Sequence, residues 1–163
     1  MAIVIGIDPG SSVTGWGVVE KNGSRILYRD SGVIRTSRKS DRPNRLSVIK
    51  NALDEVIREH SPDAAAVEDV FLAKNPRSAL KLGETRGVIL LSAAEAGVEV
   101  FEYSPREVKG SVTGVGSAHK SQVAAMVVKL LAPGHEPASE DETDALAVAF
   151  CHALRMMSPG RNA

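Results

Sequence analysis

The sequence is poor in the residue types that build several common kinds of functional site. Of its 163 residues only one is a cysteine, Cys151, and four are histidines scattered along the chain. A single cysteine excludes an internal disulfide and any multi-cysteine metal site, and scattered histidines form no His/Cys cluster. Because Cys151 lies among apolar residues, we expect it to be a small buried side chain.

Long apolar runs and a net charge are also missing. No stretch reaches the ~18 apolar residues of a membrane span, and the chain does not begin with the pattern of a secretory signal. We therefore expect a cytoplasmic protein that does not associate with membranes. The formal net charge is zero, yet eight basic residues fall between Arg25 and Lys50. A neutral total can therefore coexist with a local basic surface.

Nucleotide-binding and nucleophile motifs are absent as well, since the sequence contains no Walker-type loop, no serine nucleophile elbow and no dinucleotide fingerprint. The apolar patterning instead predicts one α/β domain over residues 1–157, followed by a short tail at 158–163. Asn22-Gly23 is a hairpin signal between two early strands. The expected strands are 2–8, 14–20, 25–34, 63–70 and 98–103, and the expected helices are 43–60, 76–96, 105–112, 118–131 and 139–157.

This order of elements predicts a five-stranded mixed sheet in which three antiparallel strands are followed by parallel ones. Helices then cover both of its faces. The helix at 76–96 is apolar nearly all round in its second half, and Gly83 and Gly87 offer close approach. A helix that is apolar on more than one face must bury more than one face, so it is either central or packed on a partner chain.

Carboxylates stand where charge is costly to bury. Asp8 and Glu68 each end an apolar strand, and Asp141 and Asp144 share one face of the last helix because they are three residues apart. Each has an ordinary alternative, since an aspartate before Pro-Gly can start a turn and Glu68 can be a surface residue. Ser139 and Glu142 form a capping box that partly accounts for Asp141, but it does not explain Asp144 in the second turn.

The four acids would lie close together if the first and fourth strands are neighbours and the last helix crosses them. Four converging carboxylates repel one another and do not ionise together without cations. Mg²⁺ prefers oxygen ligands and takes one or two carboxylates together with phosphate oxygens. A pair of such ions can hold an attacking water and a leaving oxygen on opposite sides of a phosphodiester.

Four stretches carry a family resemblance, in this order: GIDPGSSVTGWGV, AAAVEDVFLAKNPRSALKLGETRGV, FEYSPREVKGSVTGVGSAHKSQV and DETDALAVA. Together they resemble the RuvC family of bacterial Holliday junction resolvases, in the RNase H-like superfamily. The resemblance extends from Met1 to about His152. It implies an RNase H-like fold and a Mg²⁺-dependent endonuclease that makes paired, symmetric nicks in four-way DNA junctions during recombination and repair. Mn²⁺ is expected to substitute for Mg²⁺.

The resemblance also implies roles for individual positions and partners. A homodimer is expected through the helix at 76–96, together with cooperation with the RuvA–RuvB branch-migration machinery. Asp69, directly after Glu68, is an additional acid that we expect to point to the opposite face and to be non-catalytic. The implied catalytic and metal-binding acids are Asp8, Glu68, Asp141 and Asp144; Lys120 is implied as both catalytic and DNA-binding, and the further DNA-binding residues are Phe71, Lys74, Arg77 and Lys109.

Three other functions are consistent with parts of the sequence. An actin-like ATPase or sugar kinase also opens with a strand, an aspartate and a glycine, but it needs a second glycine-rich loop and a longer chain. A junction-binding module without catalysis would use the acids only in caps and turns. A smaller RNase H-like relative that processes RNA shares the GIDPG opening, but not the FLAKNPRSALKLGETRG stretch.

Overall fold

The computed structural model describes residues 1–69, 75–131 and 137–156. Its elements follow the predicted order, with boundaries within a few residues of those expected. The strands are β1 (Ala2–Asp8), β2 (Val13–Asn22), β3 (Arg25–Arg35), β4 (Ala64–Glu68) and β5 (Glu99–Tyr103). The helices are α1 (Arg42–His60), α2 (Pro76–Glu95), α3 (Pro105–Thr113), α4 (Lys120–Leu131) and α5 (Glu140–Arg155).

The strands form one mixed sheet in the order β3-β2-β1-β4-β5. β2 pairs antiparallel with both β1 and β3, whereas β1 pairs parallel with β4, and β4 with β5. The predicted fold class, an RNase H-like mixed sheet with antiparallel strands followed by parallel ones, is therefore confirmed. The predicted neighbours β1 and β4 are also confirmed, so the ends of these two strands lie side by side.

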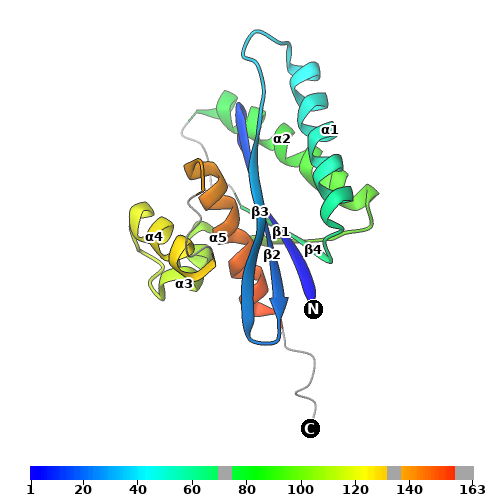
Figure 1. The fold of residues 1–163 in the computed structure, drawn as a ribbon. Helices are drawn as coiled ribbons and strands as arrows, with labels where there is room; N and C mark the ends of the chain where they lie inside the picture. The colour runs from blue at the N-terminus through cyan, green and yellow to red at the C-terminus, as the bar shows by residue number, and fades with distance from the viewer. Residues whose placement is uncertain (70–74, 132–136, 157–163) are drawn as a thin grey trace.

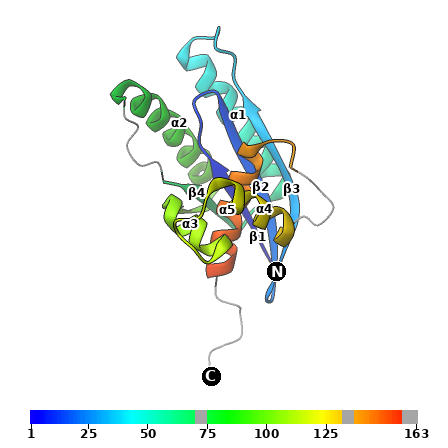
Figure 2. The ribbon, with the colours of Figure 1, turned by 90° about the vertical axis from the view of Figure 1, so that its left-hand side faces the viewer.

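Helices cover both faces of the sheet, and strand alternation decides which residue faces which layer. α1 and α2 lie together on one side, while α3, α4 and α5 lie on the other (Figures 1 and 2). In β1, Ile5 and Ile7 pack in the core under α1 and α2, whereas Val4 belongs to the core under α5. The apolar run of β1 is therefore continuous because each face of the strand is buried in a different core.

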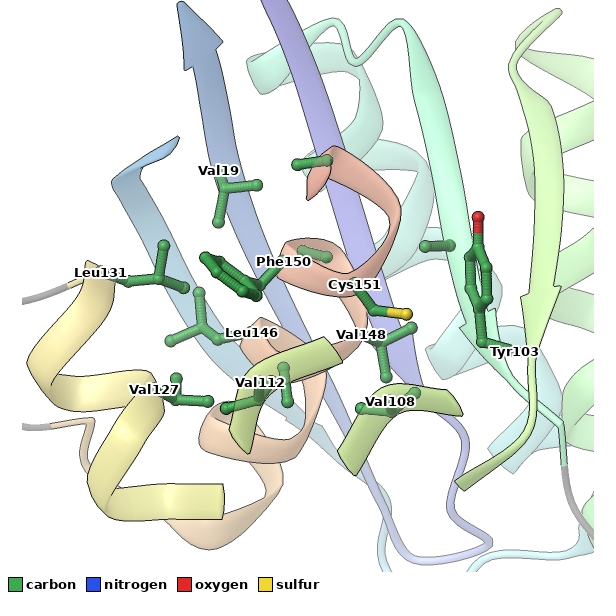
Figure 3. Packing of buried hydrophobic residues seen from close by; sticks show 14 of the residues in the cluster. Val19, Tyr103, Val108, Val112, Val127, Leu131, Leu146, Val148, Phe150 and Cys151 are labelled. Carbon is green, nitrogen blue, oxygen red and sulfur yellow. The ribbon is translucent and has the colours of Figure 1, made fainter. Parts of the chain in front are cut away.

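The core on the α5 side is built mainly from helix side chains. Leu146, Val148 and Phe150 of α5 pack against Val112 of α3 and Val127 of α4 (Figure 3). α5 is buried along almost its whole length, which positions its first turn rigidly over the sheet.

Two expectations based on missing residue types can be compared with the structure. Cys151 is fully buried and unpaired, as expected. Among the described residues, no helix is both long enough and apolar enough to span a lipid bilayer.

Candidate active site

Asp8 and Glu68 project from the same face of the sheet at its carboxyl-terminal edge. Gly6 of β1 pairs with Ala66 of β4, and the next pair is Ile7 with Val67. Since side chains alternate along a strand, Asp8 continues the face of Val4 and Gly6, and Glu68 continues the face of Ala66. Both carboxylates therefore face the layer that contains α5.

α5 approaches this face at backbone distance, because glycines leave no side chain in between. A Cβ atom added at Gly6 would lie 2.1 Å from the carbonyl oxygen of Ala145, and one added at Gly15 would lie 2.0 Å from that of Asp141. Gly15 is the direct partner of Asp8 in the β1–β2 ladder. The close approach therefore brings the first turn of α5, with Asp141, beside the end of β1.

The start of α5 is capped differently from the prediction. Ser139 is the N-cap and accepts a hydrogen bond from the Glu142 backbone N–H, as expected for half of a capping box. The other half is wrong, because the buried Glu142 carboxylate accepts from the Ala138 N–H and from the Ser31 hydroxyl of β3 instead. Glu142 thus ties the first turn of α5 to the sheet. Spacing alone did not indicate this second role.

The electrostatics show that the acids act on one another. The pKa of Asp8 is raised from 3.8 to about 7, first by burial and then by the charges of Glu68, Asp144 and Asp141, while Lys120 acts in the opposite direction. Burial also raises the pKa of Glu68, and the Asp144 carboxylate adds to that effect. Mutual destabilisation of this kind is the property that a bound cation would relieve.

Two lysines stand beside the acids. The ammonium of Lys120 lies 3.0 Å from a carboxylate oxygen of Asp144 and 3.1 Å from one of Glu140. Glu68, Asp144, Lys109 and Lys120 line one cavity of about 220 Å³, whose remaining walls are apolar. The structure thus brings Lys109 and Lys120 to the acid cluster, where the resemblance placed them.

The donor set suits a hard divalent cation, although its side chains are not already gathered around one position. Among residues 1–69, 75–131 and 137–156, no three Asp, Glu, His or Cys side chains lie close enough to hold a metal. Carboxylate oxygens are nevertheless the ligands that Mg²⁺ accepts, and Asp144 now contacts Lys120. Asp144 would have to shift from Lys120 toward the other acids when a cation binds.

The remaining predicted DNA-binding residues have different outcomes. Arg77 is exposed in the first turn of α2, where the Asn75 side chain caps the helix. Phe71 and Lys74 lie outside the described residues. Arg35, the last residue of β3, and Arg38 and Lys39 in the loop after it are exposed at the sheet edge that carries Asp8.

Two arginines of this basic stretch, Arg42 and Arg45, already have partners within the protein. Arg42 forms an ion pair with Glu84 and donates to the hydroxyl of Thr85 on α2. Arg45 donates to the hydroxyls of Thr36, at 3.1 Å, and Ser12, at 3.3 Å. Arg45 therefore holds the loop directly after Asp8 in place. The sequence did not indicate this role, because Arg45 lies more than 30 residues from Ser12 along the chain.

Comparisons with known proteins agree with this geometry. A model of the family "Crossover junction endodeoxyribonuclease RuvC" matches residues 4–152. The chain belongs to the RuvC family. A family member from Citrifermentans bemidjiense is 49% identical over 151 residues, covering 93% of this chain and 92% of the relative. Another from Histophilus somni is 51% identical over 153 residues, covering 94% of this chain and 80% of the relative.

Solved structures of RuvC proteins share the fold. Thermus thermophilus RuvC in complex with a Holliday junction substrate matches with a TM-score of 0.89 at 36% identity, over 94% of each chain. The yeast mitochondrial Holliday junction resolvase Ydc2 matches with a TM-score of 0.68 at 12% identity, over 93% of this chain and 77% of that one. The second likeness concerns the fold alone. The family match favours a RuvC protein over the kinase and RNA-processing alternatives.

Proposed function

We propose that this protein is a Holliday junction resolvase that cuts four-way DNA junctions by metal-dependent phosphodiester hydrolysis. The observation that supports this most directly is the group of four mutually repelling carboxylates, delivered by β1, β4 and α5 to one edge of the sheet. A RuvC relative solved with a junction substrate, at 36% identity over 94% of both chains, supports the same substrate.

Asp8, Glu68, Asp141 and Asp144 are the side chains that would hold Mg²⁺, with Mn²⁺ as a substitute. Two bound ions supply acidification of the attacking water and stabilisation of the charge on the leaving oxygen. Asp8 ends the central strand of the sheet and would be the most rigidly held of the four ligands. Asp141, on the first turn of α5, is proposed to orient the water.

The lysines act on the DNA. Lys120 has an exposed side chain beside Asp144 and would neutralise the phosphate at the cut. Lys109 lines the same cavity and would contact a neighbouring phosphate. Arg77 and the exposed residues Arg35, Arg38 and Lys39 would extend this contact along the backbone, which makes the affinity salt-dependent. Phe71 and Lys74 are proposed to contact the junction DNA as well.

The experiment that tests the function compares two DNA substrates. Labelled four-way junction and matched linear duplex are incubated with the protein, with Mg²⁺ and with a chelator. We expect paired, symmetric nicks in the junction alone, and only with Mg²⁺. Equal cutting of both substrates, or cutting without a divalent ion, contradicts the proposal.

A homodimer through α2 completes the proposal. The outward face of α2 carries exposed Leu80, Leu91 and Ala94, and an added Cβ at Gly83 or Gly87 would meet no atom within 4 Å. A symmetric pair of such faces would place two copies of the acid cluster on a junction of near two-fold symmetry. Cooperation with RuvA–RuvB in recombination and repair, a cytoplasmic location and a single nuclease domain at 1–157 belong to the same proposal.

Gly87→Arg should disrupt that dimer, because the new side chain would project a charge into the apolar face. We expect a monomer by analytical ultracentrifugation, and junction cutting that leaves single rather than paired nicks. Ser47→Arg adds the same side chain to an exposed position of α1 and serves as the control. A Gly87→Arg protein that stays dimeric and nicks both strands would show that α2 is not the interface.

A further inference from the structure

The side chain of Arg86, on α2, is directed at the end of β4. Only 17% of the side chain is exposed. One guanidinium nitrogen, Nη1, donates to the backbone carbonyl of Glu68 at 3.3 Å. The other, Nη2, forms ion pairs with Glu102 of β5 and, at 3.7 Å, with Asp69. One arginine therefore connects a helix to the two strands that end beside the acid cluster.

The peptide group between Glu68 and Asp69 is held at both of its ends. Its carbonyl accepts from Arg86, and its N–H donates to the carbonyl of Tyr103 on β5 at 2.7 Å. Because a peptide group is planar, fixing both ends fixes its orientation. Glu68 is the last residue of β4 and still pairs with Tyr103 of β5. Arg86 therefore adds a second hold on this peptide at the point where the strand ends.

The position of Asp69, the additional acid after Glu68, is explained by the same contact. Asp69 faces away from the acid cluster, as alternation along the strand requires, and its carboxylate helps to hold the guanidinium. Glu102 holds it from the neighbouring strand. The planar guanidinium group of an arginine can bind two carboxylates and a carbonyl oxygen at the same time. A lysine ammonium is a single point charge and lacks this fixed geometry.

We propose that Arg86 is a positioning residue that fixes the metal-binding carboxylate of Glu68 through its backbone. The inference rests on the proposed function, since Glu68 matters for cleavage only if it is a ligand. Arg86 directly precedes Gly87, on the helix proposed for the dimer. The contact therefore ties the placement of a catalytic acid to the helix at the interface.

Arg86→Gln tests this in the full-length protein. We expect cleavage to slow ~10–100-fold, the usual effect of losing a second-layer partner of a metal ligand. The half-saturating Mg²⁺ concentration should rise, while junction affinity and dimerisation stay within about twofold of the parent. Hydrogen exchange at the Asp69 amide should accelerate at least about tenfold, which is a measurement independent of activity.

Two further variants separate positioning from general stability. Arg86→Lys keeps the charge but loses the fork, so it should retain the fold and still show the Mg²⁺ shift; complete rescue by lysine would contradict the proposal. Arg29→Gln removes an arginine ion pair to Glu20 on the β2–β3 hairpin, at the other end of the strands from Asp8, and should leave cleavage unchanged.

The outcomes also distinguish the inference from the function beneath it. If the parent protein does not cut junctions, the proposed function fails, and the exchange rate at Asp69 still reports whether Arg86 anchors this peptide. If the parent cuts and Arg86→Gln has parental cleavage and Mg²⁺ dependence, the positioning role is overturned. Should Arg86→Gln fail to fold, Arg86→Lys carries the same comparison.

Discussion

Asp8→Asn should abolish junction cutting while making the metal-free protein more stable. Loss of a proposed metal ligand should slow cleavage by more than the ~100-fold that a second-layer partner can cost. Junction binding should persist, because removing a negative charge does not weaken phosphate contacts. A protein that binds but does not cut would exclude the alternative of a junction-binding module whose acids serve only caps and turns.

The gain in stability follows from the pKa of Asp8, which is raised from 3.8 to about 7 in the folded chain. A raised folded pKa means that the folded state holds its proton more tightly than the unfolded chain does. The cost of charging Asp8 therefore begins above pH 3.8 and is complete above about pH 7, where it reaches up to about 4 kcal/mol. Asparagine avoids this cost.

Urea unfolding in the presence of a chelator measures the difference. We expect Asp8→Asn to exceed the parent in unfolding free energy at pH 8 and to match it near pH 4. Glu55→Gln changes the net charge equally at an exposed position of α1 and should show no such gain. An Asp8→Asn protein that is less stable than the parent at pH 8 would mean that burial and the neighbouring carboxylates do not disfavour the charged form of Asp8.

Gly15→Ala should impair the site by forcing apart β2 and the first turn of α5. The new Cβ would lie 2.0 Å from the carbonyl oxygen of Asp141 and 2.6 Å from its carbonyl carbon, so backbone must move. The first turn of α5 would shift away from β1, carrying Asp141 and Asp144 with it. We expect cleavage to fall at least ~100-fold, and the unfolding free energy to fall by about 1–3 kcal/mol, the range for overpacking.

Gly110→Ala is the matched control for this substitution. Its nearest contacts for an added Cβ, both on Gly116, lie at an ordinary 3.8 Å, and it sits within α3, where alanine is favoured over glycine. Its unfolding free energy should equal or exceed that of the parent. Normal cleavage by Gly15→Ala would show that α5 can retreat without moving its aspartates.

The parts of the site that follow from strand alternation were predictable. The apolar runs before Asp8 and Glu68 specify buried neighbouring strands, and a period of two places both acids on one face while turning Asp69 to the other. The last helix was also predictable, since Asp141 and Asp144 are three residues apart on it. Local pattern carries all of this information.

Contacts between distant segments were not predictable in the same way. The partners of Arg42 and Arg45 lie on α2 and on the loop after β1, and nothing near either arginine in the sequence indicates them. The Glu142 carboxylate turns to Ser31 of β3 rather than to its own helix cap. When a side chain has two possible partners, the packing of the folded chain decides which one it contacts. Patterns in a single sequence carry no information about that packing.

The glycines beneath α5 have a consequence for how the protein tolerates mutation. The distance between α5 and the sheet is set at Gly6 and Gly15 by backbone atoms in contact with backbone, not by side chains that can repack. Exchanging one apolar residue of α5 for another can therefore change stability with little effect on where its aspartates stand. A saturation library should accept variety along α5 yet almost nothing but glycine at these two strand positions.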